Sequence, residues 1–169
     1  MNTSEIIPTT VLVSVEPGAL SLVTQPVSTL KGVTLSTQVT GRFDLVIQLN
    51  TIVPEQVYQI VSQIRSISGV VSTRTLIPFS GFSNGKNFTS GNSVALLLLG
   101  VEGQAQSLMK NLQSLPHILN ASVVPGEFDV IATIYGKDYN DIYSQIMQVC
   151  QLQGIRTSET LFAFKPVWA

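Results

Sequence analysis

The chain repeats itself once, and this repeat is the strongest constraint on what it can fold into. The tetrapeptide Gly41-Arg42-Phe43-Asp44 recurs 85 residues later as Gly126-Glu127-Phe128-Asp129. Other residues return at the same spacing: Gly18, Leu30, Val39, Tyr58, Gln63, Gly69, Thr75, Leu76 and Phe79 correspond to Gly103, Leu115, Val124, Tyr143, Gln148, Gly154, Thr160, Leu161 and Phe164. Because the offset does not change, the two copies align without a gap, and we predict two similar folding units.

The two copies are predicted to form two small domains, residues 9–79 and residues 93–165. The segment between them, residues 80–92, is rich in Gly, Ser and Asn, which is typical of a flexible linker. Phe82 and Phe88 are its apolar residues and are candidates for pinning it to the surface.

The pattern of apolar residues and breakers in the first copy predicts a β-α-β-β-α-β order. The expected strands are residues 9–16, 33–39, 43–50 and 70–79, and the expected helices are residues 19–30 and 54–67. Pro26 is awkward inside the first helix, since a proline removes a backbone hydrogen bond. Gly41 lies where a hairpin turn is needed between the middle strands. The fold class is therefore α+β, two tandem ferredoxin-like domains with antiparallel sheets.

The faces of the expected strands indicate how the sheets are covered. Phe43, Leu45, Ile47 and Leu49 share one face, which we expect to pack under the helices, and Asp44, Val46, Gln48 and Asn50 share the other. In the second copy, residues 96–99 are apolar on both faces, which indicates burial on both sides. A sheet-to-sheet packing of the two copies, as a pseudo-dimer within one chain, would account for this.

Charge is scarce in the sequence. Charged residues make up 11% of the chain, the net charge is -1, and there is no basic run that could follow a phosphate backbone. A surface with so little repulsion favours self-association. The chain has one cysteine, Cys150, and its beginning does not have the pattern of a signal peptide. The longest apolar run, residues 94–99, is far too short to span a membrane. We expect a cytoplasmic protein that binds neither nucleic acid nor membrane directly.

Three motifs of the first copy resemble the ligand-binding domain of Lrp/AsnC transcription regulators, also called the RAM domain. They are Val15-Glu16-Pro17-Gly18, Val39-Thr40-Gly41-Arg42-Phe43-Asp44 and Ser72-Thr73-Arg74-Thr75-Leu76. The second copy is similar to the family more weakly, with Pro125 in place of Thr40 and Ser158-Glu159-Thr160 in place of Thr73-Arg74-Thr75.

The resemblance implies domains that pair sheet to sheet, assemble into homo-oligomers and bind a small effector such as an amino acid at a subunit interface. Family members usually carry an N-terminal helix-turn-helix, and only a handful of residues precede the first expected strand. We therefore expect regulation through a separate protein that carries the helix-turn-helix.

The glycine hairpins are the candidate ligand site. A free amino acid needs donors for its carboxylate and an acceptor for its ammonium group, and a glycine turn followed by an aspartate offers both. The candidate residues are Gly41, Arg42, Asp44, Thr73 and Thr75 in the first copy, and Gly126, Glu127, Asp129, Ser158 and Thr160 in the second. Turn formation alone also explains a Gly-x-x-Asp pattern, so a purely structural hairpin remains open.

The remaining reactive residues favour structural roles. His117 is expected in a turn, Cys150 in the core, and Tyr58 and Tyr143 in packing. The residue pattern shows no metal site, cofactor site or catalytic set, so we expect a non-enzymatic binding and oligomerisation module. Two alternatives stay open: a structural oligomeriser without a ligand, and a cofactor-free enzyme on the ferredoxin-like fold.

Two equivalent pairs of residues carry opposite charges. Arg42 corresponds to Glu127, and Arg74 corresponds to Glu159. In a symmetric dimer of identical copies, equivalent charged residues near the axis would lie close to each other and repel. Opposite signs favour pairing of the first copy with the second, and drift at exposed positions is the alternative explanation.

Overall fold

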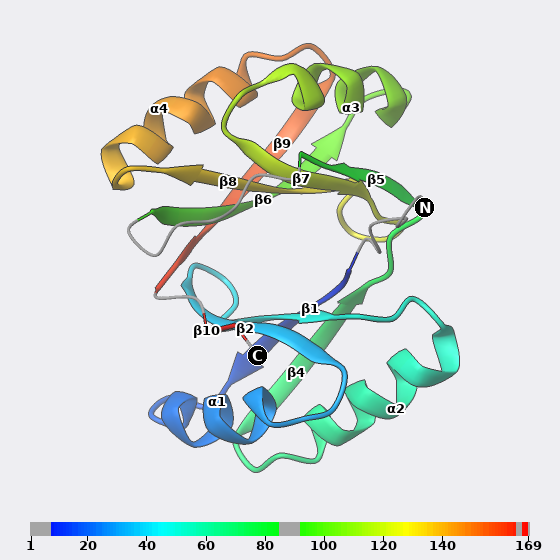
Figure 1. Cartoon of the computed structure of the whole chain (residues 1–169), viewed down its shortest axis with the longest axis vertical. Coiled ribbons are helices and arrows are strands. Elements are labelled where there is room, and N and C mark those ends of the chain that lie inside the picture. The colour runs from blue at the N-terminus through cyan, green and yellow to red at the C-terminus, as the bar shows by residue number, and fades with distance from the viewer. Residues whose placement is uncertain (1–7, 85–91, 165–166, 169) are drawn as a thin grey trace. The chain divides into compact units, whose positions relative to one another are not determined.

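The computed structural model describes residues 8–84, 92–164 and 167–168, and the chain divides into two units (Figure 1). The first unit comprises residues 1–77 and 163–169, and the second comprises residues 78–162. Both contain the β-α-β-β-α-β order. None of the helices that the structure describes is long and apolar enough to cross a membrane.

The first unit is an antiparallel sheet with two helices on one face. Its elements are β1 (Thr9–Val15), α1 (Leu20–Ser28), β2 (Val33–Thr40), β3 (Leu45–Leu49), α2 (Pro54–Arg65) and β4 (Val70–Leu76). The strand order is β4-β1-β3-β2, the ferredoxin-like arrangement. β10 (Val167–Trp168), from the C-terminal segment, pairs antiparallel with β2 and extends this sheet. Trp168 lies opposite Leu35 through its backbone; its side chain lies outside the described residues.

The second unit has the same plan. Its elements are β5 (Ser80–Ser83), β6 (Ser93–Val101), α3 (Ala105–Ser114), β7 (Ile118–Val123), β8 (Val130–Gly136), α4 (Tyr139–Cys150) and β9 (Ile155–Ala163). Its strand order is β9-β6-β8-β7-β5, all antiparallel. Each unit thus carries a fifth strand outside the predicted pattern, and in both units this strand lies on the second strand of the β-α-β-β-α-β plan.

The segment predicted as a linker, residues 80–92, starts with β5. The backbone of Ser80–Ser83 pairs with residues 120–123 of β7, and the Asn84 side chain donates to the Ile118 carbonyl (2.7 Å). Phe82 is partly buried against the core of the second unit, as its apolar character predicts. Phe88 lies outside the described residues.

The core of each unit lies between the helices and the sheet. In the first unit it contains Leu45, Ile47 and Leu49 from β3, as the strand pattern predicts, together with residues of β1, α1 and α2. Phe43 is also buried, but it precedes β3 and is not part of this core. In the second unit, Ala95, Leu97 and Leu99 of β6 pack with residues of α3, α4, β7 and β8.

The two copies do not align without a gap. The first strand is displaced by one residue: β1 pairs Thr9 with Leu49, whereas β6 pairs Ala95 with Ile134, so this strand recurs after 86 residues while its partner recurs after 85. The difference is absorbed in the turn before the helix. Gly18 and Gly103 both end this turn with positive φ (82° and 86°), which hides the missing residue from a sequence comparison.

Pro26 is accommodated near the end of α1. The helix continues for only two residues after it, and the Thr29 N–H and hydroxyl both donate to the Pro26 carbonyl (3.3 and 2.8 Å). Pro26 has no N–H to donate to the Leu22 carbonyl, and the helix ends soon after it.

Three side chains differ from the sequence prediction. Cys150 is exposed, because it lies one position beyond the inward-facing Val149 on α4. Tyr58 and Tyr143 are 73% and 61% exposed, so neither is a packing residue. His117 lies in the turn before β7, as predicted, with its ring 5.4 Å from that of Tyr135.

Candidate functional site

Each Gly-x-x-Asp hairpin is tied to the first strand of its unit by the aspartate. In the first unit the Asp44 N–H donates to the Val13 carbonyl (2.9 Å), and the Val15 N–H donates to Asp44 Oδ2 (2.9 Å). The Val39 N–H donates to the Asp44 carbonyl (3.0 Å), which closes the hairpin. One residue therefore fastens β1, β2 and β3 together where the hairpin meets the strand end.

The second hairpin repeats this arrangement. The Asp129 N–H donates to the Leu99 carbonyl (2.9 Å), the Val101 N–H donates to Asp129 Oδ2 (2.8 Å), and the Val124 N–H donates to the Asp129 carbonyl (2.9 Å). The glycines that open the hairpins, Gly41 and Gly126, have φ of 133° and 136°, a conformation that side chains strongly disfavour. Each carboxylate thus uses one oxygen for the fold.

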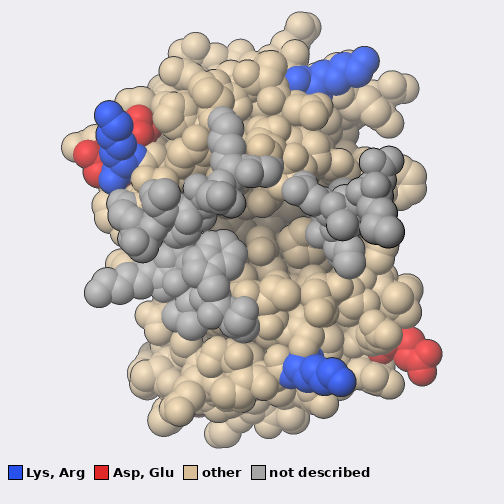
Figure 2. Space-filling view, viewed as in Figure 1, with Lys and Arg blue, Asp and Glu red and all other residues tan. Residues whose placement is uncertain are grey.

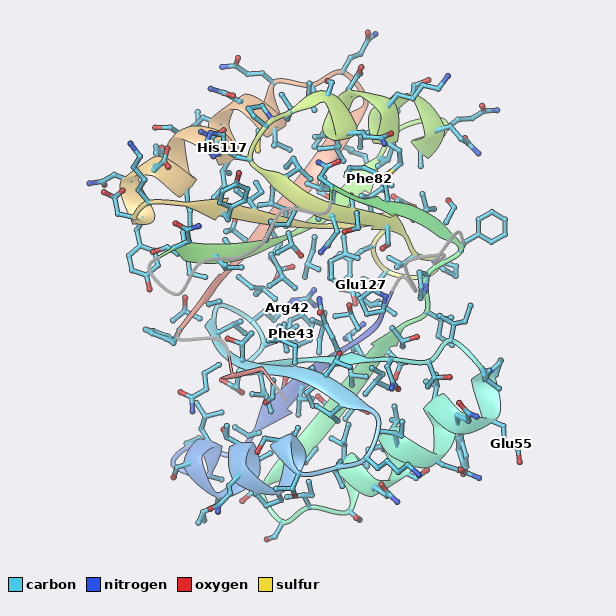
Figure 3. The ribbon with its side chains drawn as sticks, in the orientation of Figure 1. Arg42, Phe43, Glu55, Phe82, His117 and Glu127 are labelled. Atoms are coloured by element: carbon cyan, nitrogen blue, oxygen red, sulfur yellow. The ribbon has the colours of Figure 1, made fainter. Side chains whose placement is uncertain are left out.

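The hairpins differ in their second residue. The guanidinium of Arg42 lies over the ring of Phe43, 4.8 Å from its centroid, and Figure 3 shows both in the first hairpin. Glu127 occupies the corresponding position in the second hairpin (Figure 3). Both hairpins turn at a glycine of positive φ, so this residue changes the charge of the hairpin and leaves the turn conformation of the glycine the same.

The hydroxyl residues predicted for the site do not join the hairpins. Thr73 and Thr75 lie opposite Val13 and Val11 across the β4–β1 pairing. Because cross-strand partners share a face, both hydroxyls lie on the helix-covered face of β4, with β1 between them and the β2–β3 hairpin.

Ser158 and Thr160 lie opposite Leu99 and Leu97 in the same way, on the helix side of β9. The structure therefore separates the predicted residues of each copy into two groups. The hairpin groups are Gly41, Arg42 and Asp44 in the first copy and Gly126, Glu127 and Asp129 in the second. The edge-strand groups are Thr73 and Thr75 on β4 and Ser158 and Thr160 on β9.

A cavity of about 210 Å³ lies beside the second hairpin. Of the residues that the sequence predicts for the site, Asp129 lines it. The other lining residues were not predicted: Phe79, Val101, Gly103, Ala105, Val123, Val124 and Pro125. The lining is mostly apolar, with one carboxylate at its edge.

The replacement of Thr40 by Pro125 is the sequence signal that could have pointed to this cavity. It removes a hydroxyl and a backbone N–H at the mouth of the second hairpin and leaves an apolar ring in their place. The residue that departs from the family pattern, Pro125, therefore lines a mostly apolar cavity.

The sequence of the second copy is similar to a known family of domains. Residues 94–169 match the sequence model of the Lrp/AsnC ligand binding domain. This segment of the chain is similar in sequence to the Lrp/AsnC ligand binding domain. The match falls on the copy that carries the cavity, although the three sequence motifs favour the first copy as the closer relative. No curated protein sequence is significantly similar to the chain.

Several solved structures are similar to this chain. TTHA0845 from Thermus thermophilus is 28% identical over 43% of this chain and 92% of its own, with a TM-score of 0.41. The siroheme decarboxylase NirDL is 11% identical over 95% of this chain and 72% of its own, with a TM-score of 0.71. A variant of chlorite dismutase from Candidatus Nitrospira defluvii is 10% identical over 95% of this chain and 91% of its own, with a TM-score of 0.63. At 10–11% identity the two enzymes share the fold alone.

Proposed function

We propose that the protein is a non-enzymatic module that binds a small, amino-acid-like effector in the cavity at the second hairpin. The observation that carries this proposal is the coincidence of three features: the family match, the 210 Å³ cavity and Asp129 at its edge. The Oδ2 atom of Asp129 already accepts the Val101 N–H, which fixes the orientation of the carboxylate. Its negative charge can stabilise a ligand ammonium group.

The lining determines which effector fits. Cavities for drug-sized ligands occupy roughly 300–1,000 Å³, so this smaller cavity suits a molecule of amino-acid size. Phe79, Val101, Val123 and Pro125 offer apolar surface, which favours an aliphatic side chain over a charged one. The proposed ligand is an amino acid or amine with a small apolar side chain.

Calorimetric titration with a panel of amino acids tests the proposal. We expect binding of aliphatic members, and an Asp129→Asn variant should lose about 1.5–3 kcal/mol of affinity, because the amide keeps the shape but removes the charge. Asp44→Asn is the matched control, since it changes the equivalent residue of the other copy. Equal affinity in wild type and Asp129→Asn, with the fold intact, would show that this carboxylate only shapes its hairpin.

We further propose that the outer faces of the two sheets, away from the helices, are covered by pairing with each other. Leu12 and Val46 are cross-strand partners on this face of the first unit, and Leu98 and Ile131 are partners on the same face of the second. Apolar residues at the centre of a sheet face need a covering layer. An intramolecular pseudo-dimer provides one, and further association of such chains gives the proposed homo-oligomer.

Regulation of transcription, if it is the output, would require a separate protein with a helix-turn-helix. The net charge is -1, and the charged side chains on the face shown in Figure 2 are few and scattered. A surface of this kind gives little counterion release on duplex DNA. Binding of random duplex DNA by the isolated protein at physiological salt, weakening as salt rises, would contradict the proposal.

The rival function is an enzyme on the same fold, and the fold likeness to a siroheme decarboxylase and a chlorite dismutase makes it worth a direct test. One structure of that decarboxylase holds an iron-uroporphyrin III analogue. Addition of an iron tetrapyrrole to this protein should leave the absorption spectrum of the tetrapyrrole unchanged. A saturable shift of its main band, at one equivalent per chain, would favour the enzyme.

A further inference from the structure

A second depression in the second unit borders the hairpin cavity at Val101 and lies between the start of α3 and the start of β9. It measures about 340 Å³, within the roughly 300–1,000 Å³ range of small-molecule pockets. Leu108, which is buried, lies at its base. The Glu102 N–H donates to the Gly154 carbonyl (2.7 Å), and this bond holds together the two segments that form its walls.

Uncharged polar side chains dominate the walls. Gln104, Ser107 and Asn111 lie on one face of the α3 segment at spacings of three and four residues, and Gln153 stands across from them on the turn before β9. Glu102 supplies the single carboxylate. In the part of the chain that the structure describes, none of these five side chains has a hydrogen-bond partner, so their donors and acceptors are available to a ligand.

This polarity is specific to the second copy. The positions that correspond to Gln104, Ser107 and Asn111 carry Ala19, Leu22 and Pro26 in the first copy, and Ser68 corresponds to Gln153. The backbone frame is shared, since both helices follow a turn that ends in a glycine of positive φ. The turn before α3 is one residue shorter than the turn before α1. The second copy thus combines an altered turn with polar side chains on α3 where α1 of the first copy has apolar ones.

We propose that this depression binds a small, neutral, polyhydroxylated molecule of the monosaccharide class. Each side-chain amide offers two donors and an acceptor, which matches the paired donor and acceptor character of a hydroxyl group. Among the described lining residues there is no cationic side chain, and Glu102 repels anions, so a carboxylate or phosphate ligand is disfavoured.

Three relatives of one sugar ring provide the test, because they differ mainly in charge at similar size: glucose, glucuronate and glucosamine. Each is titrated into the full chain labelled with ¹⁵N, and the side-chain amide signals of Gln104, Asn111 and Gln153 are followed by NMR. We expect saturable shifts with glucose at millimolar concentration. An Asn111→Ala/Gln153→Ala double variant should weaken binding by about tenfold, as expected for loss of two hydrogen bonds.

Gln113→Ala, an exposed amide elsewhere on α3, is the control and should bind glucose as the wild type does. Tighter binding of glucuronate or glucosamine than of glucose would overturn the assignment of a neutral ligand. Shifts that persist unchanged in the double variant, or no shift with any of the three, would overturn the site itself. Because Val101 is the one lining residue that the hairpin cavity shares with this depression, neither result depends on whether an amino acid binds beside Asp129.

Discussion

At the scale of single residues, the aspartate of each hairpin joins local folding to the candidate site. Asp44 and Asp129 each accept a backbone N–H from the end of the first strand, at 2.9 and 2.8 Å. These bonds are partly shielded from water, so the N–H groups would lose their partner if the carboxylate were removed. Asp129 also borders the cavity. Its structural role and its proposed binding role can be separated by the choice of substitution.

Alanine and asparagine should separate those roles. Asp129→Ala leaves the Val101 N–H without its acceptor and should lower the free energy of unfolding by about 1–3 kcal/mol. Asp129→Asn keeps an oxygen at that position and should lower it much less. Chemical denaturation of both variants, with the same pair at Asp44, checks this. Equal stability of the alanine and asparagine variants would mean that the bond to Val101 adds nothing to the fold.

Asp141 gives the molecule a local response to acid. The hydrogen bond from the Lys137 N–H to Asp141 Oδ2 (2.9 Å) lowers the pKa of the carboxyl below its usual value of 3.8, with smaller contributions from Gln145, His117 and Lys137. A lowered pKa means that the charged form stabilises the fold. Its contribution is present above pH 3.8 and is lost as the pH falls through the lower, folded-state pKa.

An NMR titration of Asp141 should therefore show a midpoint below that of an unstructured aspartate. In an Asp141→Asn variant, the loss of stability on acidification should be smaller than in the wild type over the same range. A midpoint at or above the usual value would contradict the role assigned to the Lys137 bond.

At the scale of elements, the regular strands and helices of the first copy follow from periodicity and breakers, but pairing at a distance does not. The strand and helix bounds differ from the sequence prediction by a few residues at most, because apolar alternation, Pro54 and the turn glycines mark them. β5 escaped prediction because Ser-Gly-Phe-Ser has the composition of a linker. Its strand conformation comes from β7, some 40 residues later in the chain, and no local pattern records that pairing.

The candidate site was predictable to the same extent. The Gly-x-x-Asp hairpins follow from sequence, since glycine at positive φ and a short turn are local features. The faces of Thr73, Thr75, Ser158 and Thr160 were not predictable, because a shift of one residue in register moves a side chain to the other face of the sheet. The cavity depends on Phe79 and Pro125, whose contribution appears only once β5 and β7 lie side by side.

β5 offers a test of element pairing. A Cβ atom at Gly81 would collide with the backbone carbonyl of Ala121 on β7, so Gly81→Ala should displace β5 and lower the free energy of unfolding by about 1–3 kcal/mol. Ser80→Ala, next to it and exposed, is the control. Faster amide exchange at Asn84, whose N–H donates to the Leu119 carbonyl, should accompany the loss in Gly81→Ala alone. Unchanged exchange and stability would show that the pairing tolerates a side chain.

At the scale of the whole molecule, the outer sheet faces carry charges of opposite sign at equivalent positions. Arg74 lies opposite Leu12 on β1, and Glu159 lies opposite Leu98 on β6, so both lie on the faces away from the helices. If these faces pair, opposite signs favour association of the first copy with the second over association of like copies. Exposed ion pairs contribute only about 0–1 kcal/mol, so the charges would direct the choice of partner more than they stabilise the fold.

Charge reversal tests this selection. Arg74→Glu and Glu159→Arg, made singly, should each lower the thermal midpoint or change the oligomeric state, and the double variant should recover the wild-type behaviour. Thermal unfolding and sedimentation of the four proteins form a double-mutant cycle. Purely additive effects in the double variant would argue for drift at two unrelated surface positions.

The return of the C-terminal segment to the first unit has a consequence for synthesis on the ribosome. β2 receives β10 as its neighbour, yet residues 167–168 are translated more than 120 residues after β2. At about 5–20 residues per second, the nascent first unit holds an open strand edge for several seconds or more. Such an edge can recruit strands from neighbouring nascent chains, so codons or chaperones that alter the pace of translation should influence the yield of this protein.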